Sequence, residues 1–221
     1  MGKSQEIIKK DVIDQIYWDA RVDASNVVVE VEDGTVTLSG SVPNYDAREA
    51  AENDAWSIEG VKWVDNQIKV KFPRTRKIPS DSEIKTSAET SLSLNGNIDS
   101  TTIDVSVNNG IVTLEGTVDA YWKKFATESG ISGVNGVTSI ENKLSIVPTK
   151  SIEDESIAEE IMSSLSRKYN VNEEEIDVKV VNGEATLSGT VDSWKAYNEA
   201  MDAARYTLGV KDVNDDLVIK I

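Results

Sequence analysis

The sequence predicts an α+β protein made of three tandem, small two-layer domains, each with the order helix, strand, strand, helix, strand. The main observation is a nonapeptide that occurs three times, as Gly34-Thr-Val-Thr-Leu-Ser-Gly-Ser-Val42, Gly110-Ile-Val-Thr-Leu-Glu-Gly-Thr-Val118 and Gly183-Glu-Ala-Thr-Leu-Ser-Gly-Thr-Val191. The copies start 76 and then 73 residues apart, and a Gly-Val pair recurs at the same two offsets, at Gly60, Gly136 and Gly209. Two independent landmarks in register indicate a triplication.

Each copy begins with a predicted amphipathic helix. Its apolar residues are spaced i, i+4 and i+8, which places them on one side of a helix. They are Ile8, Val12 and Ile16; Ile84, Ala88 and Leu92; and Ile157, Ile161 and Leu165. Ser80 followed by Glu83 matches a capping box, which marks the start of the second copy's helix.

A tight antiparallel hairpin is expected after this helix. Apolar and polar residues alternate with period two on both sides of a short turn, as in Val27, Val29 and Val31 against Glu30 and Glu32, and in Val36, Leu38 and Val42 against Thr35, Thr37 and Ser39. The turns are Asp33-Gly34, Asn109-Gly110 and Asn182-Gly183, dipeptides that readily adopt the positive φ of a two-residue hairpin loop.

A second helix and a third strand complete each copy. Because a helix separates strands two and three, the connection is predicted to be a right-handed crossover that leaves those strands parallel. Each domain is therefore expected to have a three-stranded mixed sheet with two helices on its apolar face and a Thr-rich outer face. In the second copy, Gly130 and Gly133 favour an early end of the crossover helix, because glycine disfavours a helix interior.

The predicted boundaries lie where the composition changes. They are 1–72 for domain 1, 73–79 for a linker with proline at both ends, 80–147 for domain 2, 148–151 for a second linker and 152–221 for domain 3.

Composition excludes several classes of function. The 221 residues include 23 basic and 39 acidic side chains, and the net charge of −16 argues against a nucleic-acid partner. With no Cys and no His, thiol nucleophiles, His-dependent triads and thiolate or imidazole metal sites are excluded. A binding or structural role or carboxylate chemistry remains, and because the sequence has no P-loop, Gly-x-Gly-x-x-Gly, Gly-x-Ser-x-Gly or EF-hand motif, we expect no catalytic residues, no cofactor and no resident metal.

Targeting signals are not evident in the sequence. The residues after Met1 are charged rather than an apolar signal-peptide core, and no apolar run approaches the ~20 residues of a transmembrane helix. We expect a cytoplasmic protein from the chain as written, or a periplasmic one if it is a trimmed mature form.

The repeated unit resembles the BON domain, named for bacterial osmotically inducible proteins and nodulation. The resemblance rests on the turn glycine opening Gly-x-Val-Thr-Leu-x-Gly-x-Val, an aromatic residue in the second helix and the closing Gly-Val-x-x-Val-x-Asn, and it covers essentially the whole chain as three copies. It implies a bacterial origin and a role in osmotic and envelope stress. It also implies phospholipid binding, with chaperone-like or potassium-binding activity in some members.

Domain 1 is the best candidate for a lipid-facing surface. Domain 1 together with the linker that follows it, residues 1–79, has 11 basic and 14 acidic residues and a net charge of −3, against −4 for 80–150 and −9 for 151–221. The expected contact residues with a phospholipid surface or another protein are Trp56, Trp63, Lys69, Lys71, Arg74, Arg76 and Lys77. The alternative is that these tryptophans are partly buried packing residues and that the basic side chains only keep a linker solvated.

Two further groups of residues have simpler interpretations. Asn66, Asn142 and Asp215 recur on the apolar side of strand three and are expected to satisfy backbone groups there. Glu173, Glu174, Glu175 and Asp177 concentrate negative charge but lack the spacing of a calcium loop. The sequence thus predicts a non-catalytic, stress-associated binding protein, with a protein-binding or chaperone-like scaffold as the alternative and cation sensing as a third.

Overall fold

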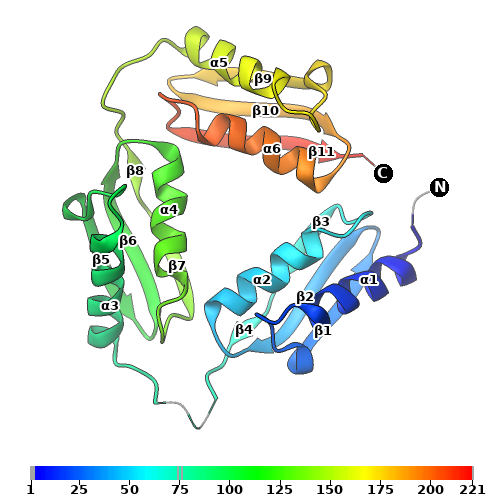
Figure 1. The fold of residues 1–221 in the computed structure, drawn as a ribbon, viewed down its shortest axis with the longest axis vertical. Coiled ribbons are helices and arrows are strands. Elements are labelled where there is room, and N and C mark those ends of the chain that lie inside the picture. Colours follow the sequence, from blue (N-terminus) through cyan, green and yellow to red (C-terminus); the bar gives the residue numbers. More distant parts are fainter. Residues whose placement is uncertain (1–2, 74, 76, 221) are drawn as a thin grey trace. The chain divides into compact units, whose positions relative to one another are not determined.

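The computed structural model describes residues 3–73, 75 and 77–220, and it contains three α+β domains in tandem (Figure 1). Domain 1 has the elements α1(Gln5–Trp18), η1(Ala24–Asn26), β1(Val27–Glu32), β2(Thr35–Val42), α2(Tyr45–Trp56), β3(Trp63–Asn66) and β4(Lys69–Val70). Domain 2 has α3(Asp81–Leu94), η2(Ser100–Thr102), β5(Ile103–Asn108), β6(Ile111–Val118), α4(Tyr121–Ser132), β7(Ser139–Asn142) and β8(Ser145–Ile146). Domain 3 has α5(Asp154–Ser166), η3(Glu173–Glu175), β9(Ile176–Val181), β10(Glu184–Val191), α6(Trp194–Arg205) and β11(Asp212–Ile219).

The sheet topology confirms the predicted mixed sheet. β1 pairs antiparallel with β2, and β2 pairs in parallel with β3 and β4. Domain 3 repeats this order, with β9 antiparallel and β11 parallel to the central β10. The third strand, predicted as continuous, is interrupted in domains 1 and 2 and continuous only in domain 3.

The hairpin turns have the predicted conformation. Asp33, Asn109 and Asn182 have φ values of 49°, 52° and 55°, and each precedes a glycine that also has positive φ. Positive φ at both central residues is the type I′ geometry, whose twist matches that of the flanking strands.

Each core forms between the two helices and one face of the sheet. The predicted stripe residues of α1, α3 and α5 are all buried, including Val12, Ala88 and Ile161 at 0% exposure. In domain 1 they pack with Val36 and Leu38 of the central strand. Ser80 and Glu83 form the predicted capping box, because the Glu83 carboxylate accepts from the Ser80 N–H at 2.8 Å.

The expectation that the second domain's crossover helix ends early was wrong. α4 spans twelve residues, the same length as α2 and α6, and continues through Gly130 to Ser132. The Gly130 carbonyl accepts a hydrogen bond of 2.5 Å from the Ser91 hydroxyl, which ties this turn of α4 to α3. Packing between the two helices therefore outweighs the unfavourable helix propensity of glycine.

Replacing Gly130 with Ala is expected to stabilise domain 2. The added Cβ would meet only Leu92 Cδ2 at 3.8 Å, an ordinary van der Waals contact, and alanine improves helix propensity by up to about 1 kcal/mol. Urea unfolding followed by circular dichroism measures the change. The reverse substitution Ala203→Gly, at the equivalent position of α6, is the matched control and should destabilise domain 3 by a similar amount. A loss of stability in Gly130→Ala would contradict this account of α4.

Candidate binding surface

The two tryptophans of the candidate surface lie together at one end of the domain 1 sheet. Trp56 is the last residue of α2, and Trp63 is the first residue of β3. Their rings form an edge-to-face pair with centroids 5.9 Å apart and an interplanar angle of 84°.

The two rings differ in burial. Trp56 is half-buried and packs against the core of domain 1. It therefore fits the alternative expectation of a packing residue. Trp63 is 61% exposed. The pair thus presents one exposed indole that is held in place by a second indole anchored in the core.

Lys69 and Lys71 of the predicted contact set lie at the other end of the same sheet, beside the end of β2. Trp63 pairs with Thr35 at the start of β2, whereas Lys69 pairs with Ser41 near its end. Six residues of strand separate them, which is roughly 20 Å. The structure therefore does not bring the tryptophans and the basic residues into one compact cluster.

The lysines do share a face with Trp63. Odd-numbered residues from Trp63 to Lys71 alternate with the buried Val64 and Ile68, so they lie on the outer, Thr-bearing face of the sheet. Lys69, Lys71 and Lys77 are all exposed. Arg74 and Arg76 lie outside the described residues.

Two further exposed aromatic residues lie in the same domain: Tyr17, which sequence reasoning missed, and Trp18, a tryptophan suited to an interface that was left out of the predicted contact set. Tyr17 and Trp18, at the end of α1, are 67% and 81% exposed, and their rings form an edge-to-face pair with centroids 5.4 Å apart. Both residues lie off the stripe formed by Ile8, Val12 and Ile16, and this spacing could have identified them.

Lys62 is a second omission, because it lies next to the exposed indole. The side chain of Lys62 covers the hairpin turn, since a Cβ on Gly34 would lie 2.8 Å from its Cγ. Lys62 directly precedes Trp63 in the sequence, and its side chain is exposed.

The recurring polar residue on strand three has the structural role that was expected. Asn66 donates from Nδ2 to the Arg48 carbonyl at 3.1 Å and to Glu52 Oε2 at 2.8 Å, and its Oδ1 accepts from the Ile68 N–H at 3.1 Å. Arg48 in turn donates to the carbonyls of Asn66 and Ile68. These bonds fasten the second helix to the edge strand.

The other two domains keep this link with local changes. Asn142 Nδ2 donates to the Lys124 carbonyl at 2.8 Å, as Asn66 does to that of Arg48. In domain 3, Asp215 accepts from the Leu217 N–H at 3.1 Å and from the hydroxyl of Tyr197 on α6. Burial and the neighbouring Asp215 carboxylate raise the pKa of the Tyr197 hydroxyl.

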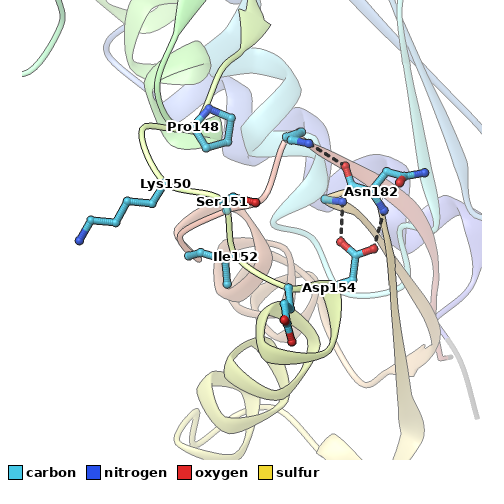
Figure 2. Close-up of a pocket in the computed structure, with 10 residues that line it drawn as sticks. Pro148, Lys150, Ser151, Ile152, Asp154 and Asn182 are labelled. Atoms are coloured by element: carbon cyan, nitrogen blue, oxygen red, sulfur yellow. Dashed lines mark hydrogen bonds between the residues drawn. The ribbon is translucent and has the colours of Figure 1, made fainter.

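A polar pocket of about 510 Å³ lies where the second linker meets domain 3 (Figure 2). Its acidic group is already engaged, because Asp154 accepts from the N–H groups of Asn182 at 2.7 Å and Gly183 at 2.9 Å. Lys211 Nζ donates to the Asn182 carbonyl at 3.1 Å. These contacts close the hairpin turn against the start of α5.

The same carboxylate clamp occurs in domain 2. There Asp81 accepts from the N–H groups of Asn109 at 2.8 Å and Gly110 at 2.9 Å. In domain 1 the equivalent residue is Gln5, which instead donates to Asp33 Oδ1 at 3.3 Å. Recurrence in two domains indicates that the clamp is a structural feature of the fold.

The acidic run before β9 is partly used in structural contacts. Glu175 forms an ion pair with Lys220 and accepts from the Thr190 hydroxyl at 2.9 Å, and these interactions lower the pKa of Glu175. Across residues 3–73, 75 and 77–220, no three acidic side chains are grouped so that they could hold a metal ion. Within the same part of the chain, no helix combines the length and apolar character of a membrane span.

Comparison with known proteins identifies the repeated unit. The model of the BON domain family matches three times, over residues 4–71, 80–148 and 153–221. The chain belongs to the BON domain family. The three matches coincide with the three α+β domains, so each BON domain is one complete helix, strand, strand, helix, strand unit.

Three curated relatives are similar to this BON protein over about 140 residues each. Osmotically-inducible protein Y of Escherichia coli is 33% identical over 146 residues, covering 63% of this chain and 73% of the relative. Outer membrane lipoprotein DolP of Haemophilus influenzae is 32% identical over 144 residues, covering 62% and 69%. A 21 kDa hemolysin of Actinobacillus pleuropneumoniae is 29% identical over 141 residues, covering 62% and 73%.

A solved structure of CdsD, a structural protein of the type III secretion system of Chlamydia trachomatis, also aligns with this BON protein. It covers 97% of this chain and 92% of CdsD at 17% identity, with a TM-score of 0.27. A similarity at this level supports no inference about function.

Proposed function

We propose that this BON protein is a non-catalytic, stress-associated binding protein of the bacterial envelope whose domain 1 associates with anionic phospholipid surfaces. The observation that supports the proposal most directly is the exposed Trp63 ring, which is held by the core-anchored Trp56. Indole rings favour the interface between lipid and water because they combine an apolar body with an N–H donor.

Charge favours domain 1 as the lipid-facing part. An anionic surface repels acidic domains, and the net charges of 80–150 and 151–221 are −4 and −9. Lys69, Lys71 and Lys77 are exposed in or just after domain 1, and each contributes at most about 1 kcal/mol at an anionic membrane. The attraction is therefore modest and sensitive to salt.

Acidic residues on the same face limit how the domain meets a membrane. Glu30 and Asp65 both pair with Thr37 in register, so they lie on the outer face between Trp63 and the lysines. A flat contact would press these carboxylates against anionic headgroups. We infer that domain 1 approaches lipid with the end of the sheet that carries Trp63, where Lys62 is the neighbouring exposed cation, and that Lys69 and Lys71, roughly 20 Å away along the sheet, contribute mainly at low salt.

The absence of catalysis in this proposal rests on composition. With neither His nor Cys in the chain, the usual nucleophiles and proton-transfer groups reduce to hydroxyls, amines and carboxylates. The envelope location is supported by the relative named as an outer membrane lipoprotein, and the stress association by the relative named as osmotically inducible.

Co-sedimentation with vesicles tests the proposal. The full chain should sediment with vesicles containing phosphatidylglycerol and not with pure phosphatidylcholine vesicles, and the bound fraction should fall between low and physiological salt. Trp63→Ser should weaken the binding about tenfold, which corresponds to roughly 1.4 kcal/mol of indole transfer.

Trp18→Ser is the matched control. Trp18 is the last residue of α1, and its indole is even more exposed than that of Trp63. The substitution should leave vesicle binding within about twofold of the wild type. If Trp18→Ser abolishes binding and Trp63→Ser does not, the lipid contact lies at the end of α1. If the wild type does not sediment with anionic vesicles at low salt, the lipid proposal fails.

A protein-binding scaffold is the second candidate, and one observation favours it. Leu94 lies 76 residues after Trp18, at the equivalent position of domain 2, and both side chains are 81% exposed at the end of the first helix. An apolar side chain exposed at the same place in two domains offers a partner the same contact on each of them. Binding through these residues would persist at high salt and in Trp63→Ser.

A further inference from the structure

Domain 1 has a buried acidic residue that the proposed function does not use. Asp54 lies in the last turn of α2 and is 4% exposed. The equivalent positions in domains 2 and 3, 76 and then 73 residues further, are Gly130 and Ala203. Since small uncharged residues suffice at this position in the other two copies, packing does not require the carboxyl group.

The side chain of Asp54 is only partly satisfied. Its Oδ1 accepts from Gln15 Nε2 of α1 at 3.1 Å. Its Oδ2 is buried and has no hydrogen-bond donor among the described residues. The nearby Ser57 hydroxyl does not help, because it donates to the Asp54 backbone carbonyl at 2.6 Å. A buried carboxylate oxygen without a donor is costly.

A second carboxyl group acts on Asp54 from the end of α1. Asp19 caps this helix, and its side chain interacts with that of Asp54. Asp19 is itself held by Arg21, whose Nε donates to both carboxylate oxygens at 3.0 and 2.9 Å and whose Nη2 donates at 2.5 Å. The groups that face Asp54 are therefore Gln15 and Asp19 from α1 and its cap, with Arg21 behind Asp19.

The strands beneath α2 contribute apolar side chains to this core, such as Val36, Leu38 and Val64. Burial is the main cause that raises the pKa of Asp54, and the proximity of Asp19 raises it further. Hydrogen bonds from Arg21 lower the pKa of Asp19 to about 2. A proton shared by the two acids consequently resides on Asp54 while Asp19 stays ionised.

We propose that Asp54 is a proton-operated latch between α1 and α2. When it is protonated, the buried oxygen of Asp54 carries the proton and becomes a hydrogen-bond donor to the Asp19 carboxylate, so it is no longer an acceptor without a donor. When it is deprotonated, two carboxylates face each other across the helix contact, and α1 is held less firmly. The latch is a property of domain 1 alone and does not depend on lipid binding.

The sign of the effect follows from the two states. Asp54 binds its proton more tightly in the folded domain than in the unfolded chain, where the pKa of Asp is about 3.9. The stabilisation is therefore complete below that value and is lost as the pH rises through the raised pKa of folded Asp54. At more acidic pH a second effect opposes this one. The stabilisation that ionised Asp19 gives to the folded domain is lost as the pH falls toward its pKa of about 2.

Two measurements on the full chain test the latch. In a ¹³C NMR titration of the side-chain carboxyl groups, assigned with Asp54→Asn, Asp54 should titrate above the value of an aspartate in an unfolded chain, which is about 3.9. Hydrogen exchange of α1, corrected for the intrinsic effect of pH, should slow as the pH is lowered from 7.5 toward 4, because protonation of Asp54 strengthens the contact between α1 and α2.

Asp54→Asn keeps a hydrogen-bond donor and cannot titrate, so the pH dependence of exchange in α1 should disappear. Asp14→Asn is the matched control, since Asp14 is a surface acid paired with Lys10, and it should keep the dependence. The latch is refuted if Asp54 titrates at or below the value of an aspartate in an unfolded chain, about 3.9, or if Asp54→Asn retains the pH dependence. Vesicle binding is not a readout here, so this result stands apart from the outcome for the lipid proposal.

Discussion

Gly189→Ala is expected to unfold domain 3 or to reduce its free energy of unfolding by at least about 3 kcal/mol. Gly189 has a φ of 120°, a backbone conformation that side chains with a Cβ rarely adopt. An added Cβ would lie 2.0 Å from the carbonyl oxygen of Glu175, at the end of η3. Since this oxygen belongs to the backbone, the clash can be relieved only by moving the chain.

The other two copies should respond in the same way. A Cβ on Gly40 would lie 1.9 Å from the Asn26 carbonyl oxygen, and one on Gly116 would lie 2.1 Å from that of Thr102. Urea unfolding monitored by circular dichroism, with hydrogen exchange to identify the affected domain, measures each effect. Gly96→Ala is the control, because no atom lies within 4 Å of its Cβ position, and it should change stability by less than about 0.5 kcal/mol. A Gly189→Ala protein as stable as the wild type would overturn the close approach seen here.

Asn66→Ala should destabilise domain 1 by about 2–3 kcal/mol. The substitution removes three hydrogen bonds, two to Arg48 and Glu52 of α2 and one from the Ile68 N–H, and each contributes roughly 1 kcal/mol. Partly buried backbone groups of the helix and the edge strand would then lack their partner. The midpoint of urea unfolding for domain 1 measures the loss.

Gln67→Ala is a suitable control for Asn66→Ala. Gln67 is the next residue, but its side chain is exposed and bonds to the neighbouring Asp65 at 2.6 Å. It should change stability by less than about 0.5 kcal/mol. Equal effects of the two substitutions would show that the link between α2 and the edge strand contributes little to stability.

Much of the fold could be predicted from the sequence, because its signals are local and occur three times. Asn-Gly and Asp-Gly dipeptides specify the hairpin turns, and the stripe of Ile8, Val12 and Ile16 specifies the buried side of α1. Because the nonapeptide occurs three times, the agreement of these signals is not a coincidence of one segment. Even the role of Asn66 could be inferred, since a polar residue at an inward position requires a partner.

The features that could not be predicted depend on contacts between distant residues. The second glycine of the nonapeptide is required because the carbonyl of Asn26, 14 residues before Gly40, passes close to it. Gly130 disfavours a helix locally, yet α4 continues because Ser91 of α3 binds its carbonyl. Asp54 resembles any surface acid in a charged helix until its burial against α1 is seen.

The candidate surface shows the same division. The tryptophans and lysines could be identified from the sequence by residue type. The sequence could not show that Trp56 packs against the core while Trp63 is exposed. It also could not show that roughly 20 Å of strand separates Trp63 from Lys69. Tyr17 was overlooked even though its position off the apolar stripe of α1 is visible in the sequence.

The most direct test of lipid association is whether the Trp63 indole enters the membrane interface. Tryptophan emission of the full chain should shift to the blue when phosphatidylglycerol vesicles are added at low salt, and brominated lipids in the same vesicles should quench it. In Trp63→Phe both changes should largely disappear. An emission spectrum that does not respond to vesicles, or a blue shift and quenching that persist in Trp63→Phe, would contradict the assignment of this end of the domain 1 sheet as the lipid contact.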